Sequence, residues 1–328
     1  MRNNHERYKQ QALEFIERAM ANDTDQSITD MARNFCDENE VDYNDSFRRK
    51  FSYWIDLFKI KLAERNSVKR ELFGLNGFEF NIPDGEDEIE IPEMALPKRY
   101  RRVAVISDIH LPYHDRNALV TALREIKSIG VDAIYINGDL MDAYQLSRHE
   151  KNKLNRSFKY EVDMTRLFFE ELRHQFKEED IYYKIGNHDV RFDKYIMDNA
   201  DQLNGLINLE DVLRLRDHRV KLVGSMTKVI LGKLNILHGH ELPVKGALNH
   251  ARAVMSKVSS NVLMGHFHRS DRSYMRDLEG DVHAVFGTGC LCKLNPKYMS
   301  INNWNHGWAL VEVEKDGTFV VESKDIFI

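Results

Sequence analysis

Five short motifs in the second part of the chain contain the side chains that divalent metal ions prefer. They are SDIH at 107–110, NGDLMD at 137–142, GNHD at 186–189, LHGHE at 237–241 and GHFH at 265–268. Each follows an apolar run that predicts a strand. Because loops at strand ends project side chains that the sheet holds in place, five separate loops could converge on one site. A mixture of oxygen and nitrogen ligands suits manganese, iron, zinc or nickel better than calcium or magnesium.

The elements that must position these motifs alternate between strand and helix from residue 101 onward. RVAVISD reads as a buried strand, NALVTALREIKSIG as a helix that ends at Gly130, and DAIYINGD as a second buried strand. This order predicts a βαβ unit. The second half of the region is richer in strands than the first. We therefore expect an α/β fold with two packed mixed sheets and helices outside them, rather than one doubly wound sheet.

The order and spacing of the five motifs resemble the signature of the calcineurin-like metallophosphoesterases: D-x-H, G-D-x-x-D, G-N-H-D/E, a lone His and G-H-x-H. The LSR segment at 146–148 is similar to phage and prophage members of that superfamily. The resemblance implies a two-sheet sandwich flanked by helices, with a dinuclear metal site at one edge. It covers residues 101–328 and carries no information about residues 1–98.

The resemblance also implies the ligands of two divalent ions, with Mn²⁺ the first choice and Fe, Zn or Ni as alternatives. Around one ion it places Asp108, His110, Asp139 and His268, and around the other Asn187, His238 and His266. Asp139 would bridge the two ions. The implied attack comes from a metal-activated hydroxide, so no side-chain nucleophile is required.

Further residues of the motifs are expected to support the reaction without binding metal. His188 would act as general acid or transition-state stabiliser, with Asp189 as the carboxylate that orients it. Asp142 would orient the ligands or the backbone instead of binding metal. His240 is an alternative to His238 as a ligand, because residues two apart on a strand point to one face. The apolar run NIL leads directly into His238 and favours that residue.

Three basic residues near the motifs are candidates for contact with substrate phosphate. Arg148 and His149 lie in a basic loop after Asp142, and Arg191 follows GNHD. The alternative for the loop is a solvated surface segment.

The predicted activity is hydrolysis of a phosphodiester, with DNA or RNA as a candidate substrate. One alternative is a phosphatase, or a nucleotide phosphodiesterase, that acts on a small molecule or a phosphoprotein. An alternative of another class is a DNA-binding or scaffold protein with an inactive phosphoesterase fold. Every signature position is filled, which argues against this last hypothesis.

The N-terminal part, residues 1–66, reads as helical, because apolar residues recur at helical spacing. Ser27 begins one helix, and a basic run, Arg48 to Lys50, begins the next. This pattern is helix-turn-helix-like and raises the hypothesis of DNA binding. Nearby acidic residues repel phosphate and favour the alternative, a helical appendage for packing, homo-oligomer formation or partner docking. Residues 67–98 have the composition of a linker, and 99–328 form the predicted catalytic domain.

The composition limits the remaining classes of function. The formal charge of -5 over 328 residues gives no basic signature for the whole chain, so contact with nucleic acid would need a local patch or metal ions. We expect no membrane span and no secretory signal, and hence a cytoplasmic protein. Cys36, Cys290 and Cys292 are expected to be reduced thiols, with a metal or redox site at the C-x-C pair as the alternative.

Overall fold

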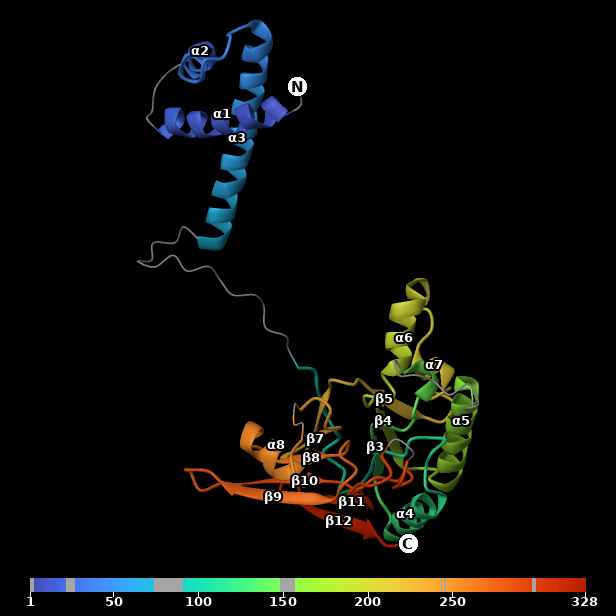
Figure 1. Ribbon diagram of the computed structural model, residues 1–328. Coiled ribbons are helices and arrows are strands. Elements are labelled where there is room, and N and C mark those ends of the chain that lie inside the picture. The colour runs from blue at the N-terminus through green and yellow to red at the C-terminus, as the bar shows by residue number, and fades with distance from the viewer. Residues whose placement is uncertain are drawn as a thin grey trace. The chain divides into compact units, whose positions relative to one another are not determined.

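The structure is a computed structural model that describes residues 3–21, 27–73, 91–147, 157–242, 244, 246–296 and 299–328. The chain separates into two compact units, Met1–Ile89 and Glu90–Ile328 (Figure 1). In the described part of the chain, no helix has both the length and the apolar character needed to cross a membrane.

The N-terminal unit consists of helices that pack around an aromatic core. The helices are α1 (Asn3–Ala21), α2 (Ile28–Asn39) and α3 (Asp45–Phe73). Ser27 caps α2 as predicted, since its Oγ accepts a hydrogen bond from the backbone N–H of Asp30 at 3.2 Å. The Phe15 and Phe35 rings meet edge to face with their centroids 5.6 Å apart. The helix α3 continues beyond residue 66, where the sequence placed the start of a linker.

The second unit contains two mixed sheets of six strands each, which confirms the predicted fold class. The first, named here the β2 sheet, has the order β12 (Phe319–Ile326), β11 (His306–Val313), β2 (Arg102–Ile106), β3 (Ala133–Asn137), β4 (Asp180–Lys184) and β5 (Val220–Val223). The second, the β7 sheet, has the order β1 (Glu93–Ala95), β6 (Lys228–Leu231), β7 (Leu234–Leu237), β8 (Val262–Met264), β10 (Val282–Gly287) and β9 (Asp271–Arg276).

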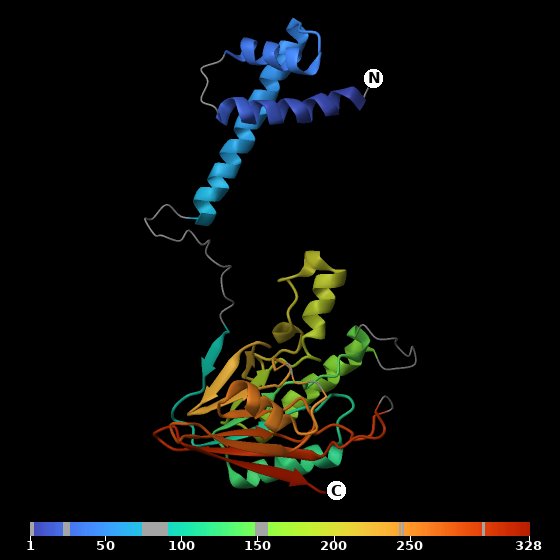
Figure 2. The same ribbon diagram turned by 60° about the vertical axis from the view of Figure 1, so that its left-hand side comes forward.

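Alternation along the strands sets the layers of this unit. Val103 and Val105 of β2 are buried in the core between the sheets, whereas Ala104 and Ile106 are buried against helices on the other face. Figure 2 shows helices outside the paired sheets. Those against the β2 sheet include α4 (Arg116–Ile129) and α5 (Phe158–Gln175), and α8 (His250–Val258) packs on the β7 sheet. The shorter elements are η1 (Tyr144–Leu146), α6 (Arg191–Asn199), η2 (Asp201–Leu203) and α7 (Leu209–Val212).

Strand direction brings the five motifs to one edge of the sandwich. Strands β2, β3 and β4 run parallel to one another in their sheet, and β7 and β8 run parallel in theirs. Each motif begins at or just after the carboxyl end of one of these five strands. The hydrogen bond from Asn137 Nδ2 to the carbonyl of Leu237, at 2.7 Å, joins two of these ends across the sandwich.

Candidate metal centre

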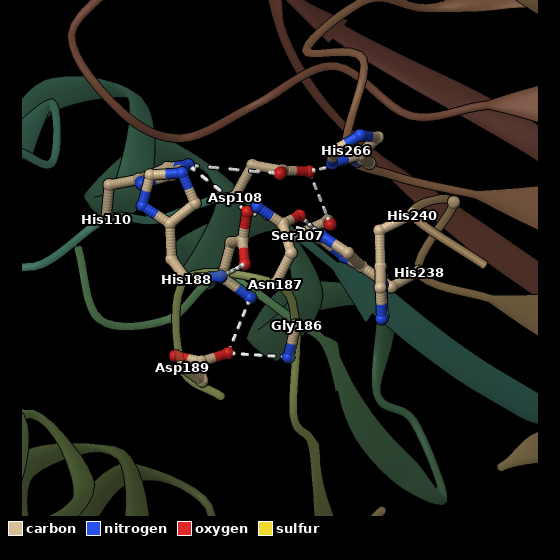
Figure 3. A network of polar contacts seen from close by, with 12 residues as sticks. Ser107, Asp108, His110, Gly186, Asn187, His188, Asp189, His238, His240 and His266 are labelled. Atoms are coloured by element: carbon tan, nitrogen blue, oxygen red, sulfur yellow. Dashed lines mark hydrogen bonds and ion pairs between the residues drawn. The ribbon is translucent and has the colours of Figure 1, made fainter. Parts of the chain in front are cut away.

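The metal-ligating atoms of the five motifs lie close together in the structure. One group, Asp108, His110 and Asp139, has its ligand atoms within 4.8 Å of one another, and so does a second group, Asp139, His238 and His266. Asp139 belongs to both groups, which is the position that the resemblance gave to the bridging ligand. Figure 3 shows His110 and His188 on one side of the site and His238 with His266 on the other, with Asp108 and Asn187 between them.

The first group presents several electron-pair donors to one buried point. His110 Nε2 and His268 Nε2 are 3.2 Å apart, and Asp108 Oδ1 lies 3.2 Å from the same nitrogen of His268. Asp139 Oδ2 is 3.8 Å from His110 Nε2. Among the described residues, Asp108 Oδ1 is buried and receives no hydrogen bond of good geometry. Buried polar atoms normally have a partner, so this donor set fits a cation.

The second group converges on His238. Its Nε2 lies 3.3 Å from Asp139 Oδ2 and 3.3 Å from Asn187 Oδ1. Its Nδ1 is 2.6 Å from the carbonyl of Asn137, so the ring can donate there and turn the Nε2 lone pair into the site. Burial alone would lower the pKa of His238, but the Asp139 carboxylate raises it to about 10. The point where these groups meet is therefore strongly attractive to positive charge.

His240 is placed differently from His238. Its Nε2 lies 2.9 Å from Ser225 Oγ, and its Nδ1 lies 3.4 Å from Glu241 Oε2. Within the described residues, it belongs to none of the His, Cys, Asp and Glu groups that could hold an ion. The structure therefore brings His238, and not His240, to the metal-ligating atoms.

The backbone at the predicted ligands is unusual. Five of them are non-glycine residues with φ between 51° and 66°: Asp108, His110, Asp139, His266 and His268. The left-handed region costs a residue with a Cβ atom about 1–2 kcal/mol. Such conformations persist only where the surrounding structure imposes them, and they gather at functional sites.

Two glycines of the motifs make room for the ligand side chains. A Cβ atom at Gly138 would lie 2.4 Å from His238 Nδ1, and one at Gly186 would lie 2.2 Å from Asp139 Oδ1. Both separations are shorter than non-bonded atoms allow. Glycine at 138 therefore lets a strand end of the β2 sheet approach His238 of the β7 sheet, and glycine at 186 lets neighbouring strand ends of the β2 sheet approach each other.

The His188 ring is held by Asp142. His188 Nδ1 is 3.0 Å from the Asp142 carbonyl and 3.3 Å from Asp142 Oδ1, and the same carboxylate lies 3.0 Å from His110 Nδ1. Burial disfavours the charged His188 ring, but Asp139 and Asp142 outweigh it and raise its pKa above the usual value. Asp142 thus orients both a predicted ligand and the predicted acid.

Asp189 has a different place from the one predicted. Its carboxylate accepts hydrogen bonds from the backbone N–H groups of Asp139, Met141 and Gly186, at 2.8, 2.9 and 2.8 Å. Burial raises its pKa to about 6, and the charge of Asp139 adds to the rise. With its oxygens engaged by three backbone donors, Asp189 does not orient the His188 ring. It fastens the loop of the second motif to that of the third.

Of the predicted phosphate contacts, only Arg191 lies in the described part of the chain. Its Nη1 donates to the carbonyl of Asp142 at 2.8 Å, and its Nη2 lies 3.3 Å from His188 Nε2. It is therefore at the edge of the site beside the predicted acid. Arg148 and His149 fall outside the described residues.

Sequence reasoning missed two charged residues that support the site. Lys184 is fully buried, and its Nζ lies 3.0 Å from Glu241 Oε1. The sequence contains a signal for such a pair, because a lysine interrupts the apolar strand IYYKIGN and a glutamate ends the motif LHGHE. Lysine and glutamate are rarely buried unless paired, so each called for a partner.

Comparison with known proteins identifies the family. A model of the calcineurin-like phosphoesterase family matches residues 101–297, and the chain belongs to that family. The resemblance drawn from the five motifs is thereby confirmed. The chain is also 24% identical over 229 residues to the Gene 54 protein of Mycobacterium phage L5, a match that covers 65% of this chain and 89% of the phage protein.

Three solved structures that are similar to this chain are a phosphoesterase, a phosphatase and a Vps29 protein. Yfce, a phosphoesterase from E. coli, is 16% identical, with 69% of this chain and 100% of that chain covered and a TM-score of 0.33. A dimetal phosphatase from Danio rerio is 12% identical, with 69% and 96% covered and a TM-score of 0.34. Vps29 from Entamoeba histolytica, complexed with zinc, is 11% identical, with 68% and 98% covered and a TM-score of 0.35.

Proposed function

We propose that this phosphoesterase-family protein is a dinuclear metal-dependent phosphodiesterase that acts on nucleic acid. The observation that supports the proposal is the sharing of Asp139 between two groups of candidate metal-ligating atoms. Two adjacent cation positions with a common carboxylate suit an in-line displacement at phosphorus, in which attacking and leaving oxygens both need charge stabilisation.

The proposed ligands are divided between two ions. Asp108, His110, Asp139 and His268 would hold one, while Asn187, His238 and His266, together with Asp139, would hold the other. When bound, two divalent ions would lower the pKa of a water molecule and offset the charge of the phosphoryl oxygens. Mn²⁺ is the first choice for this mixed donor set, with Fe, Zn and Ni as alternatives.

His188 is proposed to protonate the leaving oxygen. Asp142 fixes its Nδ1 side, so Nε2 is the nitrogen that exchanges the proton. In the structure, Arg191 donates toward that nitrogen and would repel a proton on it. A phosphate that draws the guanidinium away would release Nε2, so Arg191 would couple substrate binding to the readiness of the acid.

A nucleic-acid substrate is favoured by the basic start of α3. Arg48, Arg49 and Lys50 are all exposed there, directly after the turn that follows α2. A helix-turn-helix presents side chains to DNA from the start of its second helix, which supports the proposal. Retardation of residues 1–73 on a duplex DNA gel at low salt tests the idea. Absence of any shift at low salt, where phosphate attraction is greatest, would remove DNA binding from the proposal.

The hydrolytic proposal is tested with metal-depleted protein to which Mn²⁺ is added back. We expect turnover of bis-(p-nitrophenyl) phosphate to exceed that of p-nitrophenyl phosphate, and cleavage in a panel of single-stranded DNA, duplex DNA and RNA. Asp139→Asn should reduce turnover roughly a thousandfold, since metal positioning contributes several kcal/mol to the barrier.

Asp217→Asn, at an exposed aspartate of the same unit, is the matched control and should keep full activity. A higher rate on the monoester would favour the phosphatase alternative. No turnover with Mn²⁺, Fe²⁺, Zn²⁺ or Ni²⁺ would favour the inactive scaffold.

A further inference from the structure

We propose that the buried ion pair between Lys184 and Glu241 is a positioning device for the second metal ion. The pair joins β4 of the β2 sheet to the loop after β7, close in sequence to Asn187 and His238, two proposed ligands that lie 3.3 Å apart across the sandwich. The inference rests on the proposed dinuclear function and names residues that set the geometry of one of its two ion positions.

Lys184 ties the β2 sheet to the connection that leaves it. It is the last residue of β4, and its Nζ donates to the carbonyls of Ser225 at 2.9 Å and Thr227 at 2.6 Å. These carbonyls belong to the segment between β5 of the β2 sheet and β6 of the β7 sheet. The Lys184 ammonium group therefore holds β4, the strand before Asn187, against the segment that connects β5 with β6 and crosses from one sheet to the other.

Glu241 continues the tie into the β7 sheet. Its Oε1 lies 3.0 Å from Lys184 Nζ and accepts from the backbone N–H of His238 at 3.1 Å. Its Oε2 accepts from the N–H of Gly239 at 2.7 Å. The carboxylate thus grips the backbone of the loop that carries His238, and its charge is balanced from the other sheet.

His240 completes the same network. Its ring lies between Glu241 Oε2, at 3.4 Å, and Ser225 Oγ, at 2.9 Å. Residue 225 is also an anchor of Lys184. His240 is therefore part of the network around Lys184 and Glu241, and its contacts there keep it away from the candidate ligand groups.

The position of the pair makes its effect selective. Asn187 is three residues beyond Lys184, and Asn187 Oδ1 lies 3.3 Å from His238 Nε2. A shift of either anchor changes this separation. Asp108 and His110 lie on a different loop, and Asp142 Oδ1 supports that loop at 3.0 Å from His110 Nδ1. A buried ion pair is weak evidence for stability, because desolvation of both charges offsets their attraction, so its value here lies in geometry.

The test uses the full chain with both charges removed. In Lys184→Met/Glu241→Gln, no unpaired charge is left buried, and the introduced glutamine side chain keeps one acceptor for the loop. Mn²⁺ binding is measured by calorimetry, with elemental analysis for stoichiometry. We expect the first ion to bind as in the unaltered protein and the second to bind about ten- to a hundredfold more weakly, as for other groups that orient a ligand.

Lys221→Met is the matched control. This lysine lies on the neighbouring strand β5, is half exposed, and pairs with Asp180 at 3.0 Å. Its loss should leave both ions unaffected. If the double variant does not fold, Glu241→Gln alone decides the question by the same measurement.

The outcomes separate this inference from the proposed function. Two ions bound with unaltered affinity in the variant, or equal weakening of both, would overturn the positioning role and leave the dinuclear centre intact. An unaltered protein that binds fewer than two ions would overturn the dinuclear proposal itself. A higher Mn²⁺ requirement for turnover would accompany the expected result.

Discussion

The candidate metal centre and the N-terminal helical unit are built on opposite principles. In the helical unit, Phe15, Phe35 and Phe51 fill an apolar core, and Ser27 caps the helix that it precedes. At the metal centre, buried aspartates and histidines sit on backbone that their side chains disfavour. The contrast teaches that local conformational preferences are broken where polar side chains are gathered in the interior and kept where apolar packing forms the core.

The largest effect in this comparison is expected from a cavity in the helical unit. Phe35 is fully buried, and Phe35→Ala should destabilise that unit by about 3–5 kcal/mol. Thermal unfolding followed by circular dichroism measures the loss. Turnover of a small diester should stay unchanged, because the two units are separately compact. A fall in that turnover would contradict the comparison, because it would show that the candidate metal centre depends on the N-terminal helical unit.

The next largest effect is expected on the catalytic rate and not on the stability of the fold. His188→Asn should lower kcat roughly a hundredfold, the usual contribution of a positioned acid, while the melting temperature changes little. Mn²⁺ stoichiometry should remain at the unaltered value. His174→Asn on α5 is the matched control, and its kcat should not change. Loss of metal from His188→Asn would assign the residue to the ligands instead.

The smallest effect comes from a buried acid in the helical layer of the catalytic unit. Glu161 is 1% exposed, and burial raises its pKa to about 8, with the charge of Asp142 adding to the rise. The folded protein therefore holds this proton to higher pH than the unfolded chain does. The stability that Glu161 contributes is complete below its ordinary pKa and is lost as the pH rises through about 8.

Glu161→Gln cannot lose this proton and should flatten the pH profile of stability. Relative to the unaltered protein, the variant should gain on the order of 1–3 kcal/mol between pH 5 and pH 9, measured by urea unfolding. Parallel profiles for the two proteins would show that Glu161 stays ionised in the fold. Glu161 would then be a buried carboxylate whose charge is stabilised by its surroundings.

The sequence predicted the sandwich and the convergence of its loops, because both follow from repeated local patterns. At ISD and ING an apolar run gives way to polar residues or glycine, which indicates where a strand ends and a loop begins. Parallel strands bring such loops to one edge of the sheet. The partner of a buried charge follows from no such pattern. Lys184 and Glu241 are 57 positions apart in sequence, and only the packing of the two sheets brings them together.

The assignment of the His188 ring to Asp142 instead of Asp189 has the same origin. Asp189 stands next to His188 in the sequence, yet its carboxylate turns to the backbone of the second motif. Asp142 is distant in sequence and lies beside the His188 ring. Adjacency along the chain predicts little about a side chain in a tight turn, because successive residues there point in different directions.

The left-handed backbone at the five predicted ligands has an evolutionary consequence. Glycine adopts that conformation without steric cost, so replacing Asp108 or His268 by glycine would relieve local strain while removing a ligand. On stability alone, mutation would carry such a chain toward an inactive protein of the same fold. Selection for the bound ions would oppose that drift, and a lineage released from it could lose the chemistry long before it lost the sandwich.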